Sequence, residues 1–201
     1  MVRIGVLAVQ GAFEEHERVL DRLVSDGEVV QVRRREQLAD VDGFVLPGGE
    51  STTIEKLLDA GDLREPLARR IAEGAPTMAT CAGAILLASE GDEEVETTDT
   101  ELLGALDASI ERNAFGRQRE SFETELACPA LGGEPFPAVF IRAPAFADTW
   151  GRAEPWARLD DGSIVGVEQG SVLALSFHPE LSPDPRVHRY FLSKLDDGDE
   201  G

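Results

Sequence analysis

Apolar residues in the first half of the chain follow two alternating patterns. A continuous apolar run, typical of a strand buried on both faces of a sheet, covers residues 4–9, and residues 29–32, 43–46 and 77–80 predict further short strands. Apolar residues at helical spacing, with charged residues between them, cover residues 13–23, 52–58 and 63–71. This alternation predicts an α/β fold with a largely parallel sheet.

The second half of the chain has shorter apolar runs joined by turns. They predict strands at residues 109–110, 121–126, 138–141, 164–169 and 172–177. Residues 187–195 predict a closing helix. We expect these later strands to extend the sheet in antiparallel fashion.

Three predicted strands end at residues that could bind a ligand. Gln10, the Gly48–Gly49 pair and Cys81 each follow one of the apolar runs. Ligands of open α/β sheets bind at the carboxyl ends of the strands. We therefore expect these three loops to converge on one edge of the sheet.

Cys81 lies between a predicted strand and an apolar helix, among small residues. A nucleophile at such a turn protrudes from the fold, and helix amides beside it stabilise a thiolate or an oxyanion. A cysteine between apolar residues is more often an inert core residue, but a core cysteine does not need small neighbours. His178 and Glu180, two residues apart, would point to the same side in extended backbone stiffened by Pro179. Together they predict a cysteine hydrolase that forms a thioester.

Two polar segments suggest binding. In residues 47–53, paired glycines let backbone N–H groups face a ligand, and the same segment can be a tight turn with Ser51 or Thr52 as helix N-cap. It is not a phosphate loop of the Walker type. In residues 111–118, arginines either clamp a carboxylate or belong to a solvated loop.

The charge is unusual for an otherwise ordinary globular composition. The chain has 39 acidic against 19 basic residues and a formal net charge of −20, and Lys56 and Lys194 are its only lysines. Such a surface repels nucleic acid and anionic membranes, so we expect neither as a partner. An acidic face can be merely solvated, but the scarcity of lysine favours adaptation to high salt, and hence a halophilic source.

Several classes of site and segment are excluded. Cys81 and Cys128 give no disulfide framework, and the cysteines and histidines lack the spacing of metal ligands. We expect no metal and no cofactor, and His16 and His188 are weaker candidates for chemistry than His178. The first apolar run is too short for a signal peptide or a membrane span, which predicts a cytoplasmic protein with free thiols.

These motifs resemble the class I glutamine amidotransferases. Within that class, four segments are similar to the glutaminase subunits of pyridoxal 5′-phosphate synthase, namely residues 5–12, 46–53, 112–118 and 140–144. The resemblance runs from Arg3 to about Leu195. It implies a single domain over residues 1–195, a flavodoxin-like three-layer sandwich, followed by an acidic disordered tail at residues 196–201.

The resemblance also implies roles for individual residues. Cys81 would attack the side-chain amide of L-glutamine, and His178 and Glu180 would complete the catalytic relay. The implied glutamine-binding residues are Gly49, Glu50, Ser51, Arg112, Ile141 and Arg142. The amides of Gly49 and Ala82 would form the oxyanion hole. Gln10 would lie at the interface with the partner subunit or take part in activation of the site. Ammonia would pass to a separate, barrel-shaped synthase subunit.

One residue departs from the family pattern, and alternatives remain open. Ala79 stands where the family usually has glycine. This difference predicts a slightly altered turn in a site that remains active. A glutaminase of histidine or purine biosynthesis is an alternative, which residues 112–118 disfavour. A stand-alone cysteine peptidase or deglycase of similar fold is another. A non-enzymatic binding subunit is disfavoured by the intact Cys, His and Glu set.

Overall fold

The fold is built on one large mixed β-sheet with helices on both faces. The computed structural model describes residues 1–98, 100–116 and 121–196. The strands of the large sheet are β1 (Val2–Leu7), β2 (Gly27–Val32), β3 (Gly43–Leu46), β4 (Thr77–Thr80), β5 (Ala88–Gly91), β6 (Leu106–Glu111), β9 (Ala145–Thr149), β10 (Glu154–Arg158), β11 (Ile164–Gln169) and β12 (Val172–Leu175). A separate ladder contains β7 (Ser121–Leu126) and β8 (Phe136–Ile141). The α-helices are α1 (Phe13–Leu23), α2 (Ser51–Ala60), α3 (Arg64–Ala72), α4 (Ala82–Leu87), α5 (Glu93–Thr97) and α6 (Arg186–Asp196).

The strand order confirms the predicted α/β fold with a mainly parallel sheet and added antiparallel strands. The order is β2-β1-β3-β4-β12-β11-β9-β6-β5, with β10 paired to β11. The first five of these strands pair in parallel, in the order of flavodoxin-like sheets. Strand β11 is antiparallel to β12 and to β9, and β9 is antiparallel to β6.

Two predicted strands, 121–126 and 138–141, form their own hairpin ladder instead of extending the large sheet. Their side chains alternate between covered and exposed, whereas the central strands are buried on both faces. Phe122 and Phe140 stack with ring centroids 4.5 Å apart on the covered face. A strand pair with one apolar face needs cover on that face only, so it packs as a flap beside the sheet.

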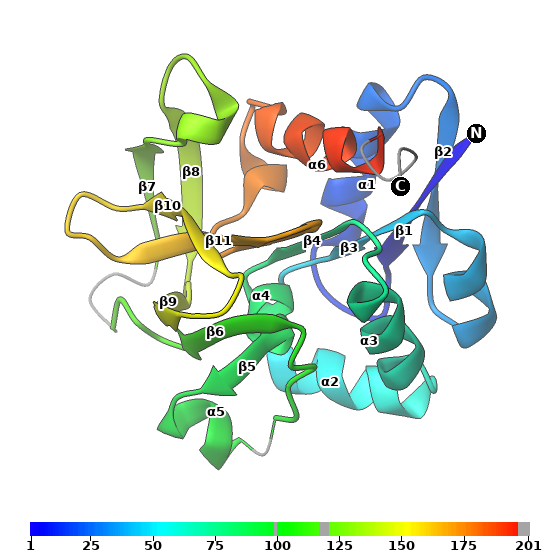
Figure 1. The fold of residues 1–201 in the computed structure, drawn as a ribbon, viewed down its shortest axis with the longest axis horizontal. Coiled ribbons are helices and arrows are strands. Elements are labelled where there is room, and N and C mark those ends of the chain that lie inside the picture. Colours follow the sequence, from blue (N-terminus) through cyan, green and yellow to red (C-terminus); the bar gives the residue numbers. More distant parts are fainter. Residues whose placement is uncertain (99, 117–120, 197–201) are drawn as a thin grey trace.

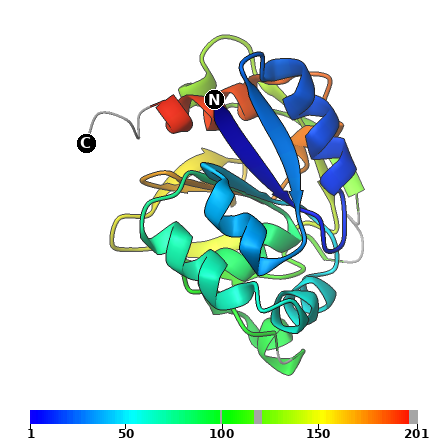
Figure 2. The ribbon, with the colours of Figure 1, turned by 90° about the vertical axis from the view of Figure 1, so that its right-hand side faces the viewer.

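Side chains on opposite faces of the sheet supply two hydrophobic cores. Ile4 and Val6 pack with Leu20 of α1 and Phe191 of α6, whereas Leu7 packs with residues of α2, α3 and α4 on the other face. Figure 1 shows α1 and α6 on one side of the sheet and α2 to α4 on the other, and Figure 2 shows the same layers from the side. The helices and sheet therefore form three layers.

Some boundaries differ from the sequence prediction. Strand β12 ends at Leu175, before the predicted residue 177. Helix α6 continues to Asp196, and residues 197–201 of the predicted tail lie outside the described residues. Among the described residues, no helix is long and apolar enough to cross a membrane.

Candidate active site

Cys81 forms a sharp turn between β4 and α4. Its backbone φ of 48° and ψ of −108° lie in a region that residues with a side chain rarely adopt. The turn is held by hydrogen bonds from Cys81 N–H to Leu175 O (2.8 Å) and from Ile85 N–H to Cys81 O (3.1 Å). A Cβ at Gly83 would lie 2.2 Å from Leu46 O, so only glycine allows α4 to pack this closely on β3. The strained turn presents the thiol at the carboxyl edge of the sheet.

Ala79 fits into this arrangement without interrupting the strand. It is fully buried, and it pairs with Leu46 of β3 and Ala174 of β12 in regular parallel register. The methyl group at this position therefore contributes to the core two residues before Cys81.

His178 and Glu180 meet through a turn. Strand β12 has already ended, and His178 precedes a 3₁₀ turn at Pro179–Leu181. The expectation of extended backbone is therefore wrong, because proline fixes a φ that suits the first position of a helical turn. His178 Nδ1 nevertheless lies 2.7 Å from Glu180 Oε1, and His178 N–H donates to Val139 O at 2.8 Å.

The electrostatics of this pair favour a charged imidazole. Burial alone would lower the pKa of His178, but hydrogen bonds to Cys81 and Glu180 raise it to about 10. Burial would raise the pKa of Glu180, but the neighbouring His16 and His178 lower it. The arrangement can hold a proton on His178 between a thiolate and a carboxylate.

The glycine turn after β3 lies directly against this pair. Gly48 N–H donates to Thr80 Oγ1 (3.0 Å), and Gly48 O accepts from Ala12 N–H (2.9 Å). A Cβ at Gly48 would lie 2.6 Å from His178 Cε1 and 3.2 Å from Cys81 Cβ. Only a residue without a side chain fits between the sulfur-bearing turn and the imidazole.

The predicted glutamine-binding residues around this turn come together. Glu50 N–H donates to Gln10 Oε1 at 3.0 Å, so Gln10 holds the loop from the end of β1. Gly49 is exposed, and its amide donates no hydrogen bond within the described part of the chain. The loops after β1, β3 and β4 therefore do meet at one edge of the sheet.

Glu50, and not the expected Ser51 or Thr52, caps α2. Its carboxylate accepts from the N–H groups of Thr52 (3.2 Å) and Thr53 (2.7 Å), because its side chain is long enough to reach over the first turn. Ser51 is the first helical residue and is buried. Burial would raise the pKa of Glu50, but hydrogen bonds from Thr53 and Thr52 and the charge of Arg112 lower it.

Arg112 is anchored beside Glu50. Its Nη2 donates to Glu50 Oε1 at 2.8 Å and its Nη1 to Thr98 Oγ1 at 3.0 Å. The guanidinium therefore lies at the rim of the glycine turn, where the sequence left open a carboxylate clamp or a solvated loop. Residues 117 and 118 of the same polar segment lie outside the described residues.

The remaining predicted residues flank the thiol. Cys81 Sγ lies 3.9 Å from Ile141 O at the end of β8, and the Ile141 side chain is exposed. Arg142 is exposed and has a left-handed φ of 43°. Ala82, the first residue of α4, presents a helix N-terminal amide next to Cys81.

The proteins that this chain resembles agree with this geometry. The model of the SNO glutamine amidotransferase family matches residues 6–197. The chain belongs to this family. A protein named pyridoxal 5′-phosphate synthase subunit PdxT from Carboxydothermus hydrogenoformans is 48% identical over 96% of this chain and 98% of its own length. One of the same name from Pelotomaculum thermopropionicum is 52% identical over 96% of this chain and 95% of its own length.

One solved structure supports the same conclusion, and a second shares the fold. A crystal structure described as a glutamine amidotransferase has a TM-score of 0.86 and 47% identity, and it covers 96% of this chain and 98% of its own. A structure of PurLQS from Thermotoga maritima has a TM-score of 0.66 at 17% identity, over 96% of this chain and 99% of its own, and shares the fold alone.

His16, a weaker candidate from the sequence, lies beside the Glu180 carboxylate of this amidotransferase. The residue is fully buried, and its Nε2 lies 3.3 Å from Glu180 Oε2 and 3.2 Å from Thr80 Oγ1. A signal was present: His16 follows Phe13 by three residues and precedes Leu20 by four, which puts it on the apolar stripe of α1. Its contact with Glu180 comes only from tertiary structure.

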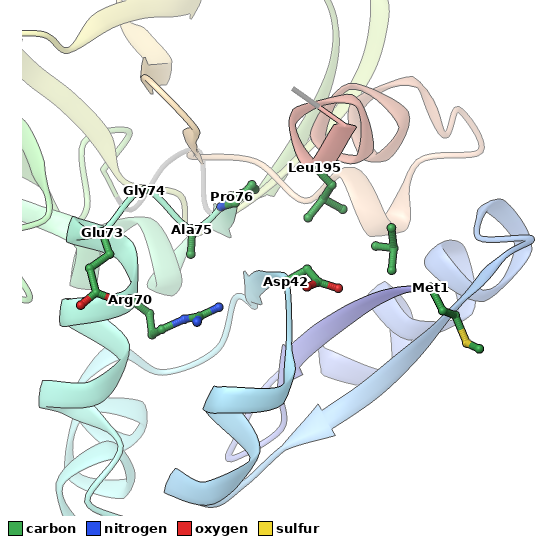
Figure 3. A pocket seen from close by; sticks show the side chains of 9 residues that line it. Met1, Asp42, Arg70, Glu73, Gly74, Ala75, Pro76 and Leu195 are labelled. Atoms are coloured by element: carbon green, nitrogen blue, oxygen red, sulfur yellow. The ribbon is translucent and has the colours of Figure 1, made fainter. Parts of the chain in front are cut away.

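A cavity of about 570 Å³ lies at the opposite edge of the sheet. Figure 3 shows its lining, which includes residues just before β3 and β4, and hence the amino ends of the strands. Arg70 there donates to Val41 O at 2.6 Å and lies over the Phe44 ring, so its guanidinium already has a structural role. The cavity is remote from the Cys81 edge, and its lining does not include Cys81, His178 or Glu180.

Proposed function

We propose that this chain is the glutaminase subunit of a pyridoxal 5′-phosphate synthase, hydrolysing L-glutamine to L-glutamate and ammonia. The observation that carries the proposal is the strained Cys81 turn beside the 2.7 Å His178–Glu180 pair. Membership of the family and relatives about half identical in sequence, named as synthase subunits, support it.

In the proposed reaction, the Cys81 thiolate attacks the side-chain amide carbon of glutamine and forms a tetrahedral oxyanion. The C–N bond then breaks, His178 gives its proton to the leaving nitrogen, and ammonia departs from a glutamyl thioester. Water, deprotonated by His178, attacks the thioester, the C–S bond breaks, and glutamate leaves with Cys81 restored. Glu180 orients the imidazole and stabilises its positive charge.

The proposed oxyanion hole consists of the amides of Gly49 and Ala82. The free, exposed Gly49 amide and the N-terminal amide of α4 support this assignment. Glu50, Ser51, Arg112, Ile141 and Arg142 are proposed to bind the rest of glutamine.

We further propose that ammonia passes to a barrel-shaped synthase subunit docked on this edge, with Gln10 linking the interface to the glycine turn. The hydrogen bond that Gln10 accepts from Glu50 supports that link. The free thiols of Cys81 and Cys128 support a reducing cytoplasm as the site of action. The net charge of −20 supports a salt-rich one, as in a halophile.

Covalent labelling tests the nucleophile. A glutamine analogue with an electrophilic side chain should modify Cys81, located by peptide mass spectrometry. Cys128 is the internal control, because burial raises the pKa of its thiol to about 12. Labelling at Cys128, or labelling that excess glutamine does not slow, would contradict the proposal. Cleavage of peptides would instead favour the peptidase alternative.

A further inference from the structure

Behind Glu180 lies a buried row of polar side chains that the proposed reaction does not use. His16 on α1 and His188 on α6 are fully buried, and His16 Nδ1 lies 3.1 Å from His188 Nε2. The other nitrogen of His16, Nε2, lies 3.2 Å from Thr80 Oγ1 and 3.3 Å from Glu180 Oε2. Burying two imidazoles is costly unless their hydrogen bonds are satisfied, so their positions are informative.

The surrounding charges determine where the protons lie. His16 Nε2 faces a carboxylate oxygen, which would repel a bare lone pair and favours a proton on that nitrogen. Nδ1 of His16 then accepts a proton donated by His188 Nε2. This leaves His188 Nδ1 as a bare acceptor, and that atom has no hydrogen-bond partner among the described residues. The opposite assignment would bury an unpaired N–H on His188, which is the more costly defect.

Glu180 uses its two oxygens differently. Oε1 is 2.7 Å from His178, whereas Oε2 is fully buried without a hydrogen bond of good geometry within the described part of the chain. The polar group next to Oε2 is the His16 N–H, which lies 3.3 Å away and slightly off the hydrogen-bond direction. His16 Nε2 makes its hydrogen bond of good geometry to Thr80 Oγ1 at 3.2 Å, and a rotation of the imidazole toward Glu180 would complete the bond to Oε2.

We propose that His16 is a positioning residue for glutamine hydrolysis, whose Nε2–H steadies the second oxygen of Glu180 and thereby fixes the first on His178. This inference rests on the proposed function. The charged or titratable groups that face His16 are Glu180 and His178 of the triad, His188 of α6 and Glu15 of its own helix. Burial lowers the pKa of His16, so the ring acts as a neutral donor and does not compete with His178 for the charge of Glu180.

The same imidazole also reaches the glycine turn. Thr80 Oγ1 accepts from Gly48 N–H at 3.0 Å and lies within hydrogen-bond distance of His16 Nε2. One buried ring therefore contacts both the carboxylate that orients the base and the hydroxyl that anchors the turn beside the thiol. Its loss should loosen both supports and leave Ile141 and Arg142, which are exposed on another loop, in place.

Three substitutions of one residue separate positioning from packing. His16→Gln places an amide nitrogen near the position of Nε2, His16→Asn places one near the position of Nδ1, and His16→Leu has neither. With the synthase subunit present, His16→Leu and His16→Asn should lower kcat by about tenfold to a hundredfold, the scale seen when a hydrogen-bond partner that orients a metal-ligating side chain is lost. KM for glutamine should change little, and His16→Gln should recover most of kcat.

A second readout does not depend on glutamine. The pH profile of Cys81 alkylation by iodoacetamide reports formation of the thiolate–imidazolium pair. With Glu180 less well held, the imidazolium is less stable, so the profile of His16→Leu should move to higher pH, and His16→Gln should restore it. Unchanged profiles would overturn the inference even if glutamine proved not to be the substrate.

Leu20→Ala is the matched control for packing, because Leu20 is fully buried on the same helix. It should lose stability yet keep kcat and the alkylation profile. The inference is overturned if Leu20→Ala reproduces the changes of His16→Leu. It is also overturned if His16→Gln, His16→Asn and His16→Leu behave alike. If His16→Leu does not fold, the comparison of His16→Gln with His16→Asn decides the question.

Discussion

At the scale of single residues, the site depends on backbone geometry that only small or strained residues can adopt. Cys81 occupies φ 48° and ψ −108°, and Gly48 fills the narrow gap between it and His178. Such strain costs about 1–3 kcal/mol and persists only where the surrounding fold enforces it. Two substitutions at Cys81 separate the effect of the strained turn on stability from its effect on turnover.

Cys81→Ala should abolish turnover while keeping glutamine binding, because other loops form the pocket. Cys81→Gly should be equally inactive but more stable than Cys81→Ala by about 1 kcal/mol, because glycine adopts this conformation without strain. Urea unfolding of the two variants measures the difference. Equal stabilities would show that the turn is not strained.

Gly48→Ala should fold but lose at least about a hundredfold in kcat, since displacing a catalytic group by about 1 Å costs that much. The added methyl would lie 2.6 Å from His178 Cε1, so the imidazole must move. Gly162→Ala is the control: the φ of 90° at this position strains an alanine, but apart from the two chain neighbours no atom of the described residues lies within 4 Å of the added Cβ. Steady-state glutaminase assays compare them, and a fully active Gly48→Ala would refute the geometry.

At the scale of elements, the prediction succeeded where one pattern runs without interruption. Helix α1 and strands β3, β4, β7 and β11 have the boundaries that the apolar pattern predicts. The antiparallel strands β9 and β10 and the helix α5 were missed, because each is only five residues long and carries weak periodicity. Pairing between distant elements, such as His16 with His188, has no local signal.

That histidine pair joins α1 to α6 and should make the fold sensitive to acid. Burial lowers the pKa of His188 to about 3, against an unfolded value of 6.5. The unfolded chain therefore binds the extra proton below pH 6.5, and stability falls as pH drops from 6.5 toward 3, by roughly 1.4 kcal/mol per pH unit for this one group.

His188→Leu should remove that part of the acid sensitivity. Urea unfolding at pH 7, 6, 5 and 4 should show a shallower loss of unfolding free energy in the variant than in the wild type. Leu20→Ala, which keeps both histidines, should retain the wild-type slope. Parallel slopes for the wild type and His188→Leu would mean that His188 is not neutral in the folded state.

At the scale of the whole molecule, we expect the net charge of −20 to make stability depend on salt. Repulsion between surface carboxylates should destabilise the fold in dilute buffer, and at about 1 M salt the screening length falls to roughly 3 Å. The melting temperature should therefore rise through a potassium chloride series up to several molar. A flat series would show that the acidic surface is incidental.

Glu123 and Glu125 provide a matched variant for the salt series. Both are exposed and lie two residues apart on the same face of β7. Replacing both by glutamine should raise the melting temperature in dilute buffer and have little effect in molar salt. A stabilisation that is the same at all salt concentrations would point to a local contact instead of screened repulsion.

Ammonia release from L-glutamine tests the central claim most directly, measured in molar potassium chloride with and without the candidate synthase subunit. The wild type alone should be slow, because the exposed Gly49 amide is free to point away from the oxyanion, and a misplaced donor costs about a hundredfold to a thousandfold. Adding the synthase should accelerate release by a comparable factor, and Cys81→Ala should release none under either condition. Ammonia production by Cys81→Ala, or none by the wild type even with the synthase, would contradict the account.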